Sequence, residues 1–299
     1  MNDDLNQFPS RSVLYVPADK PRAIAKAETL HADCVIFDLE DAVAPSNKEP
    51  AREALRDHFR THQNSPRYRV IRINGLDTPW GTEDLMAARA CMPDAVLIPK
   101  VSVSADVTDV FAALAETDAP DTLRVWAMIE TARGVVNAAD IAQRVGNRCT
   151  RLDCFVIGTN DLFKETRIAG PKARDIAQPW LMQIVLAAKA GGLRVIDGVF
   201  NTHTDPDGLR AHCSQGAAMG MDGVSLIHPA QVETANELYS PDQDTIEHAQ
   251  RIVRAFDQPE NKTKGVIALD GTMVERLHLQ QAQALLQRQR IISARLDKG

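Results

Sequence analysis

The sequence has no apolar run that approaches the roughly 18 residues needed to cross a bilayer. Its first residues, MNDDLNQFPSR, are acidic and polar, whereas a secretory signal has a basic start followed by an apolar stretch. The formal net charge is -6, so no global basic field favours nucleic acid or an anionic membrane. These absences predict a cytoplasmic protein with no nucleic-acid and no membrane partner.

Several sequence signatures of catalysis are also missing. The glycine-rich phosphate loops GxGxxG and GxxxxGK[ST] do not occur, which argues against a Rossmann dehydrogenase or an NTPase. No GxSxG elbow presents a nucleophilic serine. The five cysteines include no CxxC pair, and no HxH or HExxH spacing indicates zinc. The remaining candidates for chemistry are carboxylates and isolated basic residues.

The chain does contain one repeated pattern, in which short apolar runs alternate with longer amphipathic stretches. The runs lie at 12–18, 34–40, 68–74, 95–100, 124–130, 154–161, 194–200 and 223–229. Helix-like segments between them include 21–32, 47–62 and 177–192. Apolar strands alternating with helices indicate an α/β protein with a parallel sheet covered by helices. Eight such units suit a closed (β/α)8 TIM barrel, and an open doubly wound sheet is the alternative that periodicity does not exclude.

After residue 239 the pattern changes. A helix-like stretch at 242–256 is followed by a polar connector at 257–265 and then by the tail VIALDGTMVERLHLQQAQALLQRQ. We therefore predict a barrel catalytic domain over 1–239 and a C-terminal helical extension over 240–299. The extension is expected to act as a lid or as an arm that packs on a neighbouring subunit.

Polar residues cluster where the apolar runs end. In a barrel of this kind the working groups gather at the C-terminal ends of the strands. The residues concerned are Asp38, Glu40, Asp41, Arg72, Asn74, Lys100, Glu130, Asn160, Asp161, Asp197 and His228. A polar residue at one strand end is common, but together these would place several acids around one rim. Such acids repel one another unless a divalent cation or a cationic ligand holds them.

Glu130 and Asp161 are the best pair of metal ligands, because they end consecutive runs and two carboxylates with open positions suit Mg2+. Arg72, flanked by apolar residues, needs an anion. Either a substrate carboxylate held bidentately or a rim acid in an internal ion pair would supply one. Lys20 and Arg22 lie where the chain enters a helix, a weak signal for an anion site.

Nine short motifs, taken together and in order, carry a family resemblance. They are RSVLYVPADKP (11–21), FDLEDAV (37–43), RINGLDT (72–78), IPK (98–100), MIETARG (128–134), GTNDL (158–162), IDGVF (196–200), IHPAQV (227–232) and LDGTMV (269–274). With these motifs the chain resembles the CitE-like branch of the HpcH/HpaI aldolase and citrate lyase family. That branch includes malyl-CoA, citramalyl-CoA and citryl-CoA lyases.

The resemblance implies a (β/α)8 barrel that binds Mg2+ and a CoA thioester, and it implies a role for each matching residue. Glu130 and Asp161 match the metal-binding acids, and Arg72 matches the arginine that binds substrate oxygens. Lys20 and Arg22 match the loop against which CoA lies, and His228 and Pro229 fall in the same pocket. Asp270 matches an acid contributed by a neighbouring subunit. Glu40 and Asp41 are outer acids expected to hold metal-bound waters or cationic neighbours.

The expected function is therefore that of a Mg2+-dependent carbon-carbon lyase. It would cleave a 3-hydroxy-dicarboxylyl-CoA to acetyl-CoA and a 2-oxo acid, with Arg72 stabilising charge and Asp270 as the acid/base candidate. Three alternatives stay open: a malyl-CoA thioesterase, a CoA-independent 2-oxo-acid aldolase, and a non-catalytic binding subunit. A homotrimer or hexamer is expected from the resemblance, since Asp270 would complete a neighbour's site.

Overall fold

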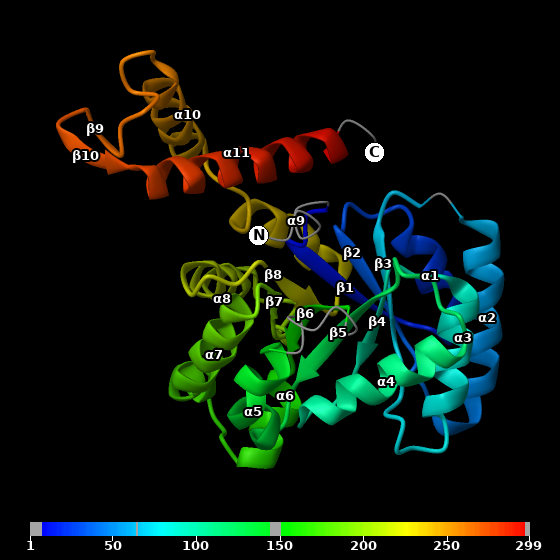
Figure 1. The fold of residues 1–299 in the computed structure, drawn as a ribbon. Coiled ribbons are helices and arrows are strands. Elements are labelled where there is room, and N and C mark those ends of the chain that lie inside the picture. The colour runs from blue at the N-terminus through cyan, green and yellow to red at the C-terminus, as the bar shows by residue number, and fades with distance from the viewer. Residues whose placement is uncertain (1–7, 64, 144–150, 297–299) are drawn as a thin grey trace. The chain divides into compact units, whose positions relative to one another are not determined.

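Eight parallel strands close into a barrel in this computed structural model, which describes residues 8–63, 65–143 and 151–296 (Figure 1). The strands are β1 (Ser12–Pro17), β2 (Cys34–Asp38), β3 (Tyr68–Arg72), β4 (Ala95–Ile98), β5 (Arg124–Ile129), β6 (Leu152–Ile157), β7 (Arg194–Asp197) and β8 (Gly223–Leu226). Each pairs in parallel with the next, and β8 pairs with β1. The prediction of a closed barrel is confirmed, and the open sheet is excluded.

Helices follow the strands and cover the barrel. They are α1 (Pro21–Ala27), α2 (Lys48–Thr61), α3 (Gly81–Cys91), α4 (Ser104–Glu116), α5 (Ala132–Gln143), α6 (Thr159–Thr166), α7 (Ala173–Ala190), α8 (Pro206–Ala218) and α9 (Val232–Leu238). Because both faces of each strand are covered, all residues of β2 and β6 are buried. After α7 the chain turns at Gly192, whose φ of +69° is a left-handed conformation that favours glycine.

The sixth apolar run differs from its prediction. The expected strand at 154–161 begins earlier, at Leu152, and ends at Ile157. Gly158 precedes α6, so Asn160 and Asp161 lie in the first turn of that helix and not at the end of a strand. Asp161 therefore lies near the positive end of the helix dipole.

The chain separates between Tyr239 and Ser240 into two compact units, and the barrel belongs to the first. The second unit contains α10 (Gln243–Asp257), β9 (Val266–Leu269), β10 (Thr272–Glu275) and α11 (Arg276–Leu296). It has its own small core, in which Ile252 and Phe256 of α10 are buried with Ile267, Val274 and Leu279. None of the helices in the described ranges is long and apolar enough to span a bilayer.

The sequence predicts a purely helical extension, but the second unit also contains two strands. Strands β9 and β10 form an antiparallel hairpin that turns at Asp270 and Gly271. Their φ angles of +51° and +78° suit a two-residue hairpin turn in which both central residues are left-handed. The Asp-Gly pair flanked by apolar residues is the sequence signal for such a hairpin, and it was overlooked.

Candidate active site

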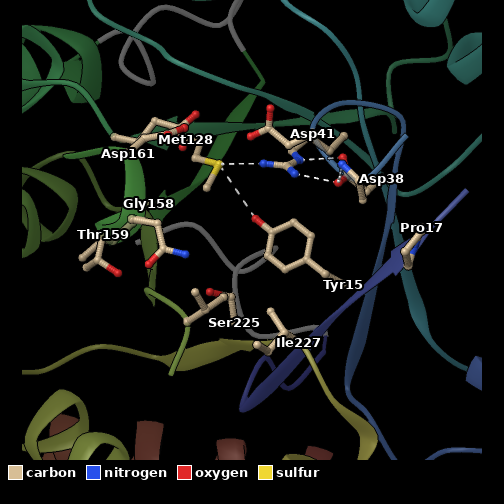
Figure 2. Close-up of a pocket in the computed structure, with 16 residues that line it drawn as sticks. Tyr15, Pro17, Asp38, Asp41, Met128, Gly158, Thr159, Asp161, Ser225 and Ile227 are labelled. Carbon is tan, nitrogen blue, oxygen red and sulfur yellow. Dashed lines mark hydrogen bonds and ion pairs between the residues drawn. The ribbon is translucent and has the colours of Figure 1, made fainter. Parts of the chain in front are cut away.

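A pocket of about 390 Å3 opens at the C-terminal ends of the barrel strands (Figure 2). Its walls come from loops and strand ends all around the barrel. The lining includes Tyr15, Pro17, Asp38, Asp41, Arg72, Met128, Glu130, Gly158, Thr159, Asn160, Asp161, Ser225 and Ile227. The structure thus brings together four predicted site residues, which are Asp41, Arg72, Glu130 and Asp161. All lie in the barrel unit.

Arg72 ends β3 and is only 7% exposed. Its Nε and Nη2 atoms donate to the two carboxylate oxygens of Asp38, at 2.7 and 2.6 Å. Asp38 is its register partner on β2, so strand pairing sets this bidentate geometry. Nη1 lies 2.9 Å from Oε2 of Glu40. Of the two anions considered for Arg72, the structure contains the internal one, and the substrate carboxylate stays a prediction.

Glu130 follows β5 and is 2% exposed. Its Oε1 accepts a hydrogen bond from the backbone N–H of Lys100 at 2.9 Å. Burial, followed by the nearby negative charge of Glu40, raises the pKa of Glu130 to about 8, and Asp161 acts in the same direction. A buried acid with this pKa is costly to ionise unless a cation lies beside it. Glu130 therefore fits a cation-binding role better than a structural one.

Gly158 makes room for Glu130. A Cβ atom at position 158 would lie 2.5 Å from both Cβ and Oε2 of Glu130, and 2.8 Å from Cε of Met128. Such distances are too short for any side chain, so the close approach of β5 and the start of α6 depends on glycine here. This packing sets the position of the Glu130 carboxylate in the pocket.

Lys100 connects the acids on the rim. Its Nζ pairs with Oε1 of Glu40, and lies 4.0 Å from Asp41 and 3.9 Å from Asp161. Burial raises the pKa of Glu40, while Arg72 and Lys100 act in the opposite direction. The predicted role of Glu40 and Asp41 as acids with cationic neighbours agrees with these contacts. Only Asp41 of the two lines the main pocket.

The loop that carries Glu40 is held from below by Lys48 of α2. The Lys48 Nζ donates to the carbonyl oxygens of Leu39 and Glu40, both at 2.7 Å, and to Oδ1 of Asn74 at 3.0 Å. Lys48 is 4% exposed, and burial lowers its pKa. An ammonium that uses three protons on fixed oxygens holds the backbone of Glu40 in place. Sequence analysis missed this residue.

The predicted CoA-binding residues lie beside the pocket and do not line it. Lys20 is exposed and pairs with Asp19 at 3.3 Å, and Arg22 is also exposed. His228 follows the pocket residue Ile227, and its ring stacks on His203 with centroids 4.6 Å apart. Pro229 begins a short 3-10 turn after it.

Asp270 is at the hairpin turn of the second unit, where its side chain is 64% exposed. Its Oδ2 lies 3.8 Å from Nε of Arg251 in the same unit, which is a long contact for an ion pair. A turn that projects an exposed carboxylate is compatible with a role in another subunit. That role stays a prediction.

The pocket offers a metal ion two carboxylate ligands, Glu130 and Asp161, and not a complete coordination shell. Among the described residues no group of three or more His, Cys, Asp or Glu side chains is placed to hold a metal. Glu130 and Asp161 line one pocket, and the charge of Asp161 is one of the causes that raise the pKa of Glu130. Mg2+ accepts such a sparse set of carboxylates, because it keeps several waters or substrate oxygens. The donor set therefore fits Mg2+ with ligands completed by water or substrate.

Tyr15 and Met128 are pocket residues that the sequence analysis did not single out. Tyr15 and Pro17 are two residues apart on β1, on the same side of the strand, and both line the pocket. The residues singled out from the sequence are those at strand ends. Side chains alternate along a barrel strand between the interior and the helices. A tyrosine at an interior position near the top of a strand was the available signal.

Comparisons with known proteins identify relatives of this chain. The HpcH/HpaI aldolase/citrate lyase family model matches residues 11–229. A (3S)-malyl-CoA thioesterase of Cereibacter sphaeroides is 46% identical over 96% of both chains. An L-malyl-CoA/beta-methylmalyl-CoA lyase of the same species is 30% identical, also over 96% of both. The CitE protein of Mycobacterium tuberculosis, solved with magnesium, acetoacetate and coenzyme A, superimposes with a TM-score of 0.74. It is 32% identical, and the match covers 95% of this chain and 98% of that one.

Proposed function

The chain belongs to the HpcH/HpaI aldolase/citrate lyase family, and on that premise we propose that it is a Mg2+-dependent malyl-CoA thioesterase. It would hydrolyse the thioester of a 3-hydroxy-dicarboxylyl-CoA such as malyl-CoA. The observation that carries this choice is the 46% identity to a (3S)-malyl-CoA thioesterase over nearly the whole chain, against 30% to a malyl-CoA lyase. The thioesterase, an alternative in the sequence analysis, thus moves ahead of the lyase.

Glu130 and Asp161 are the residues that would hold Mg2+. Bound Mg2+ would neutralise both carboxylates and act as a Lewis acid on the hydroxyl and carboxylate end of the substrate. Arg72 would bind the same end, since its guanidinium lines the pocket. Asp38 fixes the plane of that guanidinium through two hydrogen bonds. Orientation of one end of the substrate leaves its thioester to face the opening of the pocket.

Hydrolysis adds a water across the carbon-sulfur bond, with hydroxide to the acyl carbon and a proton to the CoA sulfur. A carboxylate has to accept this proton as the water attacks the acyl carbon and then pass it to the departing sulfur. Asp41 is suited to this because it is exposed and lines the pocket, and Asp270 of a neighbouring subunit is the other candidate. Lys20, Arg22, His228 and Pro229 flank pocket residues, and we assign them to the CoA chain.

Carbon-carbon cleavage is the second candidate, favoured by the presence of Arg72 and the two acids in one pocket. A base would remove the proton of the 3-hydroxyl group, and the bond between the hydroxyl-bearing carbon and the carbon next to the thioester would break. The electron pair of that bond would form the acetyl-CoA enolate, which takes up a proton from an acid, and acetyl-CoA and a 2-oxo acid would then leave. Both reactions require the same contacts to the hydroxyl and carboxylate groups of the substrate, so only a measurement of the products distinguishes them.

The discriminating experiment is an assay of malyl-CoA, β-methylmalyl-CoA, citramalyl-CoA and citryl-CoA with Mg2+. Free thiol and 2-oxo acid are measured separately, and EDTA and Glu130→Ala serve as controls. We expect thiol without 2-oxo acid, lost in both controls. A 2-oxo acid without thiol would replace hydrolysis by the lyase reaction. No product from any of the four thioesters would reject both reactions.

The proposed contribution of Asp270 to a neighbour's site can be tested by mixing two inactive variants. Glu130→Gln lacks a metal ligand in its own barrel, and Asp270→Asn lacks the acid at the hairpin turn. In a randomly mixed homotrimer or hexamer, roughly a quarter of the sites would combine an intact barrel with an intact Asp270. We expect activity to return to that extent after co-refolding. Two variants that remain inactive when mixed would place Asp270 in its own subunit's site or outside catalysis.

A further inference from the structure

Two hydrogen-bond donors converge on one sulfur atom in the pocket. The hydroxyl of Tyr15 lies 3.8 Å from Sδ of Met128, and Nη1 of Arg72 lies 3.7 Å from the same atom (Figure 2). Tyr15 comes from β1, Arg72 from β3 and Met128 from β5, so three walls of the barrel meet at this point. A thioether is a weak acceptor, so its contact with the Tyr15 hydroxyl does not use the full strength of that donor. Nη1 of Arg72 also lies 2.9 Å from Oε2 of Glu40, so only part of its donor capacity is directed at the sulfur.

Two other polar side chains of the pocket, Ser225 and Asn160, are bonded to oxygen acceptors. Ser225 donates to the carbonyl oxygen of Asp197 at 2.7 Å. Asn160 and Asn201 bond each other through their amides, at 2.8 and 3.2 Å. The Tyr15 hydroxyl differs, because its described hydrogen bond is to sulfur. A ligand oxygen in place of that sulfur would give the Tyr15 hydroxyl a stronger hydrogen bond. A ligand that bonded Ser225 or Asn160 would first have to break a hydrogen bond to oxygen.

The Tyr15 hydroxyl is also fixed in position and in protonation state. Its ring lies against the guanidinium of Arg72, with 5.0 Å between the guanidinium carbon and the ring centroid. Burial raises the pKa of Tyr15 far above its ordinary value, and the Arg72 charge offsets only part of this. The hydroxyl is therefore a neutral donor near neutral pH.

Met128 is suited to yield its place. Its side chain is unbranched, with three rotatable bonds, and such residues repack at low cost. Its methyl group already lies in the place that a side chain at Gly158 would take, so any movement of Met128 has to be a rotation away from that glycine. Rotation of the thioether would expose Nη1 of Arg72 and the hydroxyl of Tyr15 to the same small volume. A carboxylate or ketone oxygen fits two donors arranged in this way.

We propose that Tyr15 is a substrate-binding residue that shares one anionic oxygen with Arg72, and that this oxygen replaces Sδ of Met128 in the complex. The oxygen belongs to the carboxylate of the small 2-hydroxy or 2-oxo acid portion of the substrate. This inference rests on the proposed function, because it refines how the same pocket holds that portion. It adds a neutral donor to the metal ligands and the arginine.

The test measures binding of pyruvate and of L-malate to the full-length, Mg2+-loaded protein by calorimetry. Tyr15→Phe removes one oxygen atom and keeps the ring that packs on Arg72. We expect at least one probe to bind the wild type, and its affinity to fall about 10-fold or more in Tyr15→Phe, because a hydrogen bond to a charged group is lost. Mg2+ affinity and the melting temperature without ligand are expected to stay the same.

Two further variants complete the test. Tyr68→Phe is the matched control, since Tyr68 is stacked on Trp126 away from the pocket and its loss of a hydroxyl should not change binding. Met128→Leu removes the sulfur and leaves both donors, so probe affinity should be retained or increased. Equal affinities of wild type and Tyr15→Phe would overturn the inference. So would a Mg2+-loaded wild type that binds neither probe.

Failure of the proposed function is recognised separately. A wild type inactive on all four CoA thioesters, yet binding a probe through Tyr15, would reject the function and keep the subsite. A wild type active on a thioester, with Tyr15→Phe unchanged in both KM and probe affinity, would reject the subsite and keep the function.

Discussion

Replacement of Glu130 by glutamine is expected to raise the melting temperature of the metal-free protein above pH 8 while it abolishes Mg2+-dependent activity. Glutamine keeps an oxygen for the backbone N–H of Lys100, which Glu130 accepts at 2.9 Å. It removes a charge that is buried beside Glu40 and Asp161. Glu130, which the site needs as a metal ligand, thus destabilises the fold when no metal is bound.

The pH dependence follows from the raised pKa of Glu130, which is about 8 in the folded protein. An unfolded chain ionises this group near its ordinary value of 4.5. The protonated form therefore favours the fold fully below about pH 4.5, and that contribution is lost as the pH rises through 8. Relative to the variant, the wild type should lose on the order of 3 kcal/mol across this window, or roughly 5 °C or more in melting temperature.

Thermal unfolding of both proteins in EDTA, from pH 5 to pH 9, measures this effect. The two melting temperatures should be close at pH 5 and diverge toward pH 9. Addition of Mg2+ at pH 9 should raise the melting temperature of the wild type and leave that of Glu130→Gln unchanged. Glu116→Gln, at the exposed end of α4, is the control and should behave as the wild type. A variant that melts below the wild type at pH 9 would show that Glu130 is stabilising and contradict the electrostatic argument.

The architecture of the barrel and the charged residues at its rim could be predicted from the sequence, because both depend on local order along the chain. An apolar run that ends in Glu130 indicates a buried strand with its carboxylate at the C-terminal end, and the structure agrees. Asp161 is predicted to end a strand, whereas the structure places it in the first turn of α6. Asp161 nevertheless lines the same pocket as Glu130.

Residues whose role depends on packing could not be predicted in this way. Lys48 lies on an amphipathic helix, and in the sequence it resembles any solvated lysine. In the structure it is only 4% exposed, because its ammonium group bonds three oxygens in the loops that follow β2 and β3. Tyr15 looks like a typical strand residue until the barrel closes and places it opposite Met128. The Asp270-Gly271 turn is a different case, because its signal was local and a search for hairpins would have found it.

Removal of the Arg72 guanidinium is expected to destabilise the barrel and to abolish activity. In Arg72→Met, Asp38 stays 98% buried and keeps two backbone donors, the N–H groups of Glu40 and Ala42, but loses its cation. Removal of one partner from a buried ion pair costs about 3–5 kcal/mol, since the other charge is left uncompensated. Without Arg72 the pKa of Glu40, already raised by burial, rises further. The stability defect should therefore grow as the pH is raised from 5 to 8.

A second substitution separates the structural and catalytic roles of Arg72. In the Arg72→Met/Asp38→Asn double variant no unpaired charge remains at position 38, so we expect much of the stability to return and activity to stay absent. Denaturant unfolding and the four-thioester assay measure the two effects on the same preparations. Arg72→Lys keeps the charge but cannot bond both Asp38 oxygens in the plane of a guanidinium, so partial activity is expected. Activity in the stable double variant would remove Arg72 from the substrate site. Inactivity of a double variant that has regained its stability is the expected result, because the fold is then intact and only the guanidinium is missing from the pocket.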